Sequence, residues 1–159
     1  MIRLKEILIN DEEAQRLIKM IKTVIESVSG TIREGDTGVI NFIGSDNHSF
    51  QMKYYYSSRK KTFNFRELKH NYNLIRINLD NNFHKNSDGT KISGNRINIF
   101  SEEEFYQKGD GVTHQKCYPL PFESIRNSDD FLNVMGDILK YTSVNQIEKI
   151  HLNIQESLL

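Results

Sequence analysis

Hydrophobic and polar residues alternate along two segments in the middle of the chain, residues 74–80 and 95–100. In each segment, Ile and Leu side chains fall on one side and mostly polar side chains fall on the other. A period of two is typical of a β-strand that buries one face. Short turn-forming clusters separate successive segments of this kind, so we expect antiparallel hairpins. The same period predicts further strands over residues 39–43, 49–56, 62–68 and 115–118.

A helical period replaces this alternation near the N-terminus. Apolar residues recur every three or four positions from Ala14 to Val28, which predicts an amphipathic helix over residues 11–29. Asn10 or Asp11 supplies its N-cap. Lys22 is expected on the outer, solvated face of this helix, and Gly30 is placed to end it.

A second amphipathic helix is predicted near the C-terminus, with Ser128 as its N-cap and Asp129 and Asp130 in its first turn. Its buried stripe runs from Phe131 to Leu139. The order of helix, antiparallel strands and helix predicts an α+β fold, with an antiparallel sheet of five or six strands and two main helices packed on one face. The length of 159 residues fits a single domain over residues 1–159.

The charge balance narrows the classes of function. Lys and Arg total 21, Asp and Glu also total 21, and the formal net charge is zero. This excludes a strongly basic nucleic-acid protein but leaves room for a local basic patch. The single cysteine, Cys117, has no partner for an internal disulfide, which suits a reducing cytosol. Because no apolar run approaches the length of a membrane span, we expect a cytoplasmic protein with no membrane partner.

Five histidines are scattered along the chain, and none stands at metal-ligand spacing with another His, Cys or acid. We therefore expect no metal and no other cofactor. His84 and Asp88 could form a general acid/base pair. Residues 86–89, Asn-Ser-Asp-Gly, are equally typical of a turn, because Asn and Asp bond to their own backbone and Gly accepts a positive φ. We favour the turn.

Two segments are candidates for binding a partner. The predicted hairpin of residues 49–68 interleaves aromatic and basic side chains, a composition found in packed strands, in protein interfaces and on surfaces that stack bases. We rank these three interpretations in that order. Residues 101–113 are expected to form an exposed loop with an acidic cluster. The partner-binding candidates are Tyr54, Tyr55, Tyr56, Arg59 and Lys60 on the hairpin, and Glu102, Glu103 and Glu104 on the loop.

Four short motifs follow one another over residues 84–132. Residues 84–89 read His-Lys-Asn-Ser-Asp-Gly, residues 97–100 read Ile-Asn-Ile-Phe, and residues 118–120 read Tyr-Pro-Leu. Residues 127–132 then open a helix as Asn-Ser-Asp-Asp-Phe-Leu. Over residues 74–142 the chain resembles an uncharacterised family of small proteins from Gram-positive bacteria and their phages. That family typically shows His-Thr-Asn-Pro-Asp-Gly followed by a strand with His-x-His.

The resemblance is incomplete at the histidines. Ser87 replaces the proline of the family motif, and Arg96 and Asn98 stand where the strand histidines would be. A chain that keeps the scaffold but lacks most of a multi-histidine site resembles a binding protein more than an enzyme. The positions that match the motif are His84, Asn86, Asp88 and Gly89.

The chain also resembles, in type, phage anti-defence proteins, including staphylococcal inhibitors of Cas9 (anti-CRISPR proteins). The shared features are a small size, a single domain, a composition typical of AT-rich genomes and the likeness to a phage-linked family. The resemblance implies a non-enzymatic protein that binds and inhibits a bacterial defence nuclease, first of all Cas9 with its guide RNA. Direct binding to free nucleic acid is not expected. The alternative is a toxin-like endoribonuclease that uses His84 with Arg96 or His114.

Overall fold

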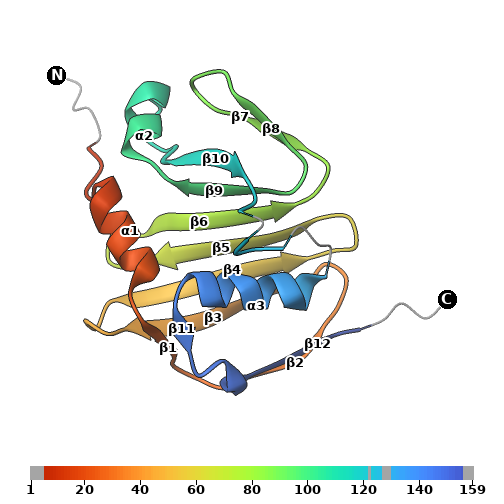
Figure 1. Ribbon diagram of the computed structural model, residues 1–159. Helices are drawn as coiled ribbons and strands as arrows, with labels where there is room; N and C mark the ends of the chain where they lie inside the picture. Colours follow the sequence, from red (N-terminus) through yellow and green to blue (C-terminus); the bar gives the residue numbers. More distant parts are fainter. Residues whose placement is uncertain (1–5, 122, 127–129, 156–159) are drawn as a thin grey trace.

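The computed structural model describes residues 6–121, 123–126 and 130–155, and Figure 1 shows how its elements are arranged. The helical elements are α1 (Asp11–Lys19), α2 (Glu102–Lys108), α3 (Phe131–Tyr141) and the 3₁₀ turn η1 (Ile147–Lys149). The strands are β1 (Lys22–Val24), β2 (Val28–Ile32), β3 (Thr37–Gly44), β4 (Ser49–Tyr56), β5 (Lys61–Glu67), β6 (Tyr72–Leu79), β7 (Phe83–Lys85), β8 (Lys91–Ser93), β9 (Arg96–Phe100), β10 (Gln115–Pro119), β11 (Val144–Asn145) and β12 (Ile150–Ile154). None of these helices is long and apolar enough to cross a membrane.

One large sheet organises the fold. Its eight strands run in the order β10-β9-β6-β5-β4-β3-β1-β11. Strands β1 and β11 are parallel, and all other neighbouring strands of this sheet are antiparallel. Strands β2 and β12 form a separate parallel pair, and β7 and β8 form a small antiparallel hairpin. The α+β class is therefore confirmed. The prediction of five or six strands, all antiparallel, is wrong, because β1 and β11 have only three and two residues, too few to show a period.

The N-terminal helix is shorter than its apolar spacing predicts. Helix α1 ends at Lys19, and the chain turns into strand β1 at Lys22. Four of the residues from Ile21 to Ile25 are β-branched, which favours an extended conformation. Lys22 has no exposed surface, so its predicted place on a solvated helix face is wrong. Gly30 lies within β2 instead of ending a helix.

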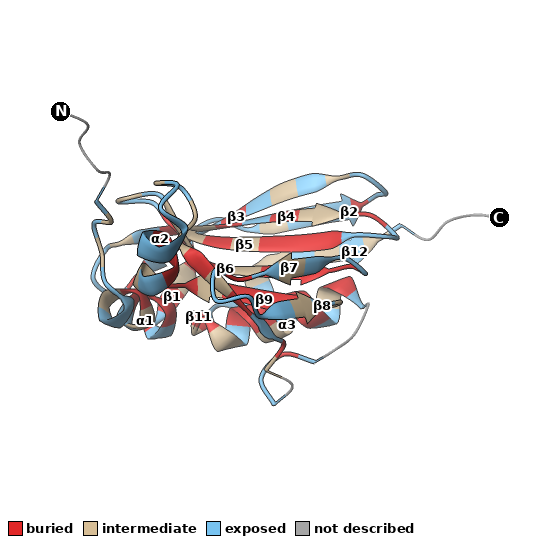
Figure 2. Ribbon diagram, turned by 90° about the horizontal axis from the view of Figure 1, so that it is seen from above, coloured by how far each residue is buried: buried red, intermediate tan, exposed pale blue. Residues whose placement is uncertain are grey.

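Helices α1 and α3 lie on the same side of the large sheet (Figures 1 and 2). The core forms there, because the helices present buried residues such as Leu17, Ile18 and Ile138 to the apolar face of the strands. The ring of Phe131 on α3 stacks on Phe63, with centroids 4.7 Å apart, and meets two further aromatic rings of β4 edge-on. This aromatic cluster fixes α3 across the sheet.

The boundaries of the other two helices also differ from the prediction. Asp130 is the N-cap of α3, and its side chain accepts a hydrogen bond from the Asn133 backbone N–H. The predicted cap, Ser128, and Asp129 lie outside the described residues. Residues 101–113 are not simply a loop, because Ser101 caps α2.

Candidate functional site

The sheet face turned away from α1 and α3 is polar. Residues that pair directly across neighbouring strands share a face, and the register joins Lys53, Asn64, Arg76 and Asn98 in one row across β4, β5, β6 and β9. A second row joins Tyr55, Thr62, Asn78 and Arg96. We call this surface the open face; in the part of the chain that the structure describes, no helix covers it over β3 and β4 (Figure 2).

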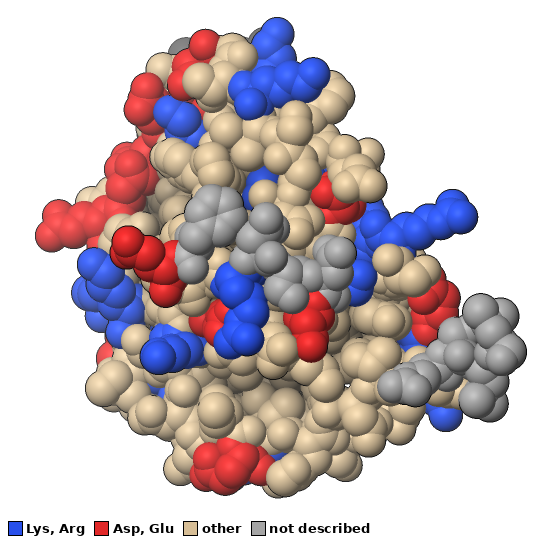
Figure 3. All heavy atoms as spheres, turned by 45° about the vertical axis from the view of Figure 1, so that its right-hand side comes forward, with Lys and Arg blue, Asp and Glu red and all other residues tan. Residues whose placement is uncertain are grey.

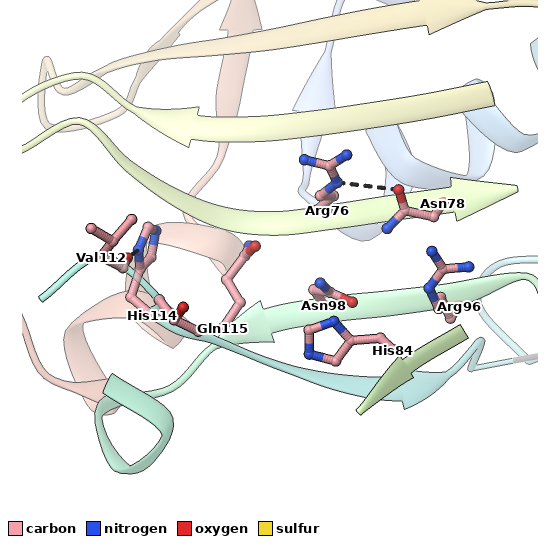
Figure 4. A pocket seen from close by; sticks show the side chains of 9 residues that line it. Arg76, Asn78, His84, Arg96, Asn98, Val112, His114 and Gln115 are labelled. Carbon is pink, nitrogen blue, oxygen red and sulfur yellow. Dashed lines mark hydrogen bonds between the residues drawn. The ribbon is translucent and has the colours of Figure 1, made fainter. Parts of the chain in front are cut away.

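A cavity of about 340 Å³ opens on this face between β6, β9 and the β7–β8 hairpin (Figure 4). A volume of this size is typical of small-ligand sites. We call it the arginine pocket. Its lining residues are Arg76, Asn78, His84, Arg96, Asn98, Val112, Thr113, His114 and Gln115. Two arginines and no carboxylate lie among them, so the wall of the pocket is cationic.

Arg96 is held rigidly in the pocket wall. Its Nη1 donates to Asp80 Oδ1 at 2.6 Å and to the Gly94 carbonyl at 2.9 Å, and the Arg96 side chain is only 9% exposed. Its Nε is buried without a partner. The carboxylate of Asp80 therefore neutralises Arg96, while Arg96 Nε and the second carboxylate oxygen, Asp80 Oδ2, are both buried without a partner.

Arg76 is the less neutralised of the two arginines. Its Nε donates to Asn78 Oδ1 at 3.2 Å, and among the described residues it forms no salt bridge. Partial burial and repulsion from Arg96 lower the pKa of Arg76, although Asp80 opposes that shift. Two neighbouring guanidinium groups with one carboxylate leave the pocket short of negative charge.

The two histidines of the pocket differ in the hydrogen bonds of their ring nitrogens. The His114 ring bonds at both nitrogens: Nδ1 lies 2.8 Å from the Val112 carbonyl, and Nε2 accepts from the Asn73 backbone N–H at 3.1 Å. His84 Nε2 is buried and has no partner. Burial lowers the pKa of both imidazoles, and for His84 the nearby Arg96 and a lysine of α2 add to the shift. Both rings are therefore neutral near pH 7. Both nitrogens of His114 are already hydrogen-bonded to the backbone, so this ring has no nitrogen left for a ligand.

Unpaired polar atoms gather on the open face. Buried polar groups in native proteins are nearly always hydrogen-bonded, so such a concentration needs an explanation. Side-chain atoms on this face, or on the hairpin beside it, that are buried without a partner are Asn64 Oδ1, Arg66 Nε, Asn73 Oδ1, Asp80 Oδ2, His84 Nε2, Arg96 Nε and Asn98 Oδ1.

The β7–β8 hairpin brings His84 to the pocket. Asn86 anchors it by donating to the Cys117 carbonyl and accepting from the Cys117 N–H, both at 2.9 Å. Ser87 donates from its backbone N–H and its hydroxyl to the carboxylate of Glu104 on α2. The predicted turn at residues 86–89 is present, with Gly89 at φ +90°. Asp88 accepts from Thr90 and pairs with a lysine of β10.

The hairpin candidates for partner binding are unequally exposed. Tyr54 is only 7% exposed, and Tyr56 packs half-buried against Phe131, so these two tyrosines pack on the core side of the strand, as the first-ranked interpretation expects, and offer little surface to a partner. Alternation turns Tyr54 and Tyr56 toward the helices and leaves Tyr55 half-buried on the open face. Arg59 and Lys60 are exposed at the turn between β4 and β5.

The acidic candidates are also divided. Glu104 is only 2% exposed and holds the β7–β8 hairpin, so its expected place in an exposed loop is wrong. Glu102 caps the start of α1 by accepting from the Asp11 N–H. Of these three acidic residues, Glu103 alone is exposed. Helix α2 and the β4–β5 turn lie at opposite ends of the sheet (Figure 1), so the two groups do not form one surface.

An exposed apolar patch borders the polar region. Ile21 and Ile25 flank the buried residues of β1, and Val39 and Ile43 point outward from β3 beside them. These four and Leu68 are between 38% and 57% exposed, and we call them the apolar patch. Contiguous exposed apolar side chains bordered by polar ones are typical of protein interaction surfaces.

Charge elsewhere on the molecule is mixed. On the side shown in Figure 3, acidic side chains follow the upper left edge, and lysine, arginine and acidic residues are interspersed over the rest. Among the described residues, no group of three or more His, Cys, Asp or Glu side chains could hold a metal ion. The fold and the site thus define a small α+β protein with an open, polar and locally cationic sheet face.

A model of a family of unknown function, DUF6978, matches residues 9–144, and the chain belongs to that family. No curated protein and no solved structure matches it. The matched span includes the whole large sheet apart from Asn145 of β11, and all of the arginine pocket.

Proposed function

We propose that this protein is a non-enzymatic binding protein that inhibits a bacterial defence nuclease and docks on it through the open face. The observation that carries the proposal is that the apolar patch on β1 and β3 and the polar rows that begin at Lys53 on β4 lie on the same side of the sheet. An apolar area and Arg side chains on the same face match the composition of energetically important protein interfaces.

The chemistry of the arginine pocket supports binding more than catalysis. Metal-independent RNA cleavage by general acid–base chemistry needs groups that exchange protons. His114 uses both ring nitrogens to hold neighbouring backbone groups, and Arg96 is fixed by Asp80. His84 remains as one neutral imidazole with a free nitrogen. One free imidazole can donate or accept a hydrogen bond, but it has no second free imidazole beside it.

The partner that we propose is a Cas9-type nuclease loaded with its guide RNA. The motive is the resemblance in type to phage anti-defence proteins, and the open face adds a surface of suitable composition. Such a nuclease presents both protein and an exposed nucleic-acid backbone. The apolar patch would contact the protein, and the cationic rows would face negative charge.

The rival function is a toxin-like endoribonuclease, and one observation favours it: His84 and Arg96 line the same pocket. If His84 were a general base, His84→Ala would lower RNA cleavage on the order of 10²-fold or more. Turnover of RNA by the purified wild-type protein, abolished by that substitution, would establish the rival and reject our proposal.

The test is a titration of target cleavage by guided Cas9 from several staphylococcal-type systems. We expect wild-type protein to stop cleavage with a stoichiometric end point. Ile43→Ser in the apolar patch should weaken inhibition about tenfold, since full burial of an Ile side chain contributes about 1.5–3 kcal/mol. Tyr106→Ser is the matched control, because Tyr106 is 60% exposed but lies on α2. Unchanged cleavage in a large excess of protein would reject the proposal.

A further inference from the structure

The arginine pocket offers donors and acceptors together. Arg76 supplies a positive charge without a salt-bridge partner among the described residues, and Arg96 supplies an unused Nε–H. Asn98 is only 9% exposed, yet its Oδ1 has no hydrogen-bond partner. Figure 4 shows the His84 ring beside Asn98 and shows Arg76 on the neighbouring strand. An occupant of this pocket must therefore bring negative charge for the arginines and N–H or O–H groups for the amide oxygen.

A carboxylate meets only half of this requirement. It satisfies guanidinium donors, but an ionised carboxylate has no proton to donate to Asn98 Oδ1. A nucleotide meets both halves. Its phosphate accepts from arginine, and its base edge and sugar hydroxyls donate to amide oxygens. Asparagine amides are also common partners of base edges, because they can donate and accept side by side.

The register of the sheet extends the site beyond one nucleotide. Arg76 lies in the same cross-strand row as Lys53, two strands away, at a distance of about 10 Å given the usual strand spacing. Asn64, whose Oδ1 is also unpaired, lies between them. Tyr55 is half-buried on the same face and presents an aromatic ring near the end of this row. Cations along a shallow face with an aromatic ring nearby are typical of surfaces that bind single strands.

We propose that the arginine pocket binds one nucleotide of a single-stranded nucleic acid, with the phosphate on Arg76 and the base or sugar on Asn98 and His84. The strand then continues across β5 toward Lys53. This inference deepens the proposed function and rests on the binding role of the open face. It departs from the expectation, drawn from the sequence, that the protein does not bind free nucleic acid. In this arrangement the polar half of the open face binds the guide or another single strand, and does not bind protein.

The experiment is fluorescence anisotropy with labelled RNA and DNA oligonucleotides of about 12 nucleotides, a length within the usual range for such surfaces. Each is titrated with the full chain at about 50 mM and about 200 mM salt. We expect Arg76→Gln to weaken binding about tenfold and to reduce the salt slope by about one. Asn98→Ala should weaken binding severalfold and leave the salt slope unchanged, because an amide neutralises no phosphate. Tighter binding of RNA than of DNA would identify a sugar hydroxyl as the donor, and equal binding would identify the base edge.

The matched control is Arg126→Gln, which removes an arginine that pairs with Asp137 of α3 on the other side of the sheet. Circular dichroism checks that each variant is folded. Absence of binding to both oligonucleotides at the lower salt, or equal effects of Arg76→Gln and Arg126→Gln, would overturn the inference. Equal competition by poly-glutamate would also overturn it and point to an acidic protein ligand. Inhibition of the nuclease that survives Arg76→Gln but not Ile43→Ser would reject the nucleotide site alone and leave the proposed function intact.

Discussion

Lys22→Met is expected to destabilise the protein, because the Lys22 ammonium joins three parts of the fold. Its Nζ donates to the carbonyls of Ile18 and Met20 at 2.8 Å each and to the Thr142 carbonyl at 2.7 Å. It also lies 4.8 Å from the centroid of the Phe50 ring. Met retains the length of the side chain but leaves all three carbonyls without this donor.

The magnitude follows from two opposing effects. A buried carbonyl that loses its partner costs about 1–3 kcal/mol, so three of them cost about 3–9 kcal/mol. Removing a buried ammonium recovers several kcal/mol of desolvation free energy. We expect a net loss of about 3 kcal/mol. For a domain of this size, such a loss lowers Tm by about 6–12 °C.

The effect should depend on pH. Burial lowers the pKa of Lys22 to about 7 from its ordinary value of 10.5. Above pH 7 the side chain is increasingly a neutral amine, which donates to two of the three carbonyls at a time and no longer carries the cost of a buried charge. Between these two values the unfolded state binds a proton that the folded state lacks, so the contribution of Lys22 to stability rises with pH. The slope is at most about 1.4 kcal/mol per pH unit. The wild type should therefore gain stability relative to Lys22→Met between pH 7 and pH 10.

The assay is urea unfolding of both proteins, followed by far-ultraviolet circular dichroism at several pH values in this range. Titrations of other groups affect both proteins and cancel in the difference. A variant as stable as the wild type would mean that the three hydrogen bonds do not outweigh desolvation. A difference that shrinks as the pH rises would contradict the sign of the pKa shift.

Three further predictions concern the arginine pocket and its hairpin. Arg76→Gln should raise the free energy of unfolding by about 0.5 kcal/mol or more, because it removes repulsion from Arg96; a lower Tm would contradict this. Asn86→Ala should cost about 2–4 kcal/mol, since it leaves the Cys117 N–H and carbonyl unpaired; unchanged urea unfolding would contradict this. Because burial raises the pKa of the Cys117 thiol to about 11, iodoacetamide at pH 8 should modify Cys117 slowly in the wild type and faster in Asn86→Ala.

The strands of the central sheet could be predicted because each is long enough to show its period. The segment 49–56 matches β4 residue for residue. The segment from Ile21 to Val28 misled the helix prediction, because β-branched residues fell by chance at helical spacing. Tertiary contacts decided the outcome, since Lys22 is buried only when β1 pairs with β3 and β11. No local pattern records that pairing.

The candidate site was harder to predict for a related reason. Alternation places Arg76, Asn78, Arg96 and Asn98 on the polar sides of two segments, which was a usable signal. That these sides face each other depends on β6 pairing with β9, a contact between segments separated by a loop. The net charge of zero also concealed a local excess of cations. Exposure of Glu104 was overestimated because composition alone does not show which side of an element packs.

The most direct test of the open face as the binding surface is lysine labelling of the protein in complex with guided Cas9. Lys53 is exposed on the open face, and Lys140 is exposed on α3 on the other side of the sheet. Reductive methylation read by mass spectrometry compares the two lysines in free and bound protein. We predict that binding protects Lys53 and leaves Lys140 as reactive as before. Protection of Lys140 with Lys53 unaffected, or no change at either residue, would contradict the account.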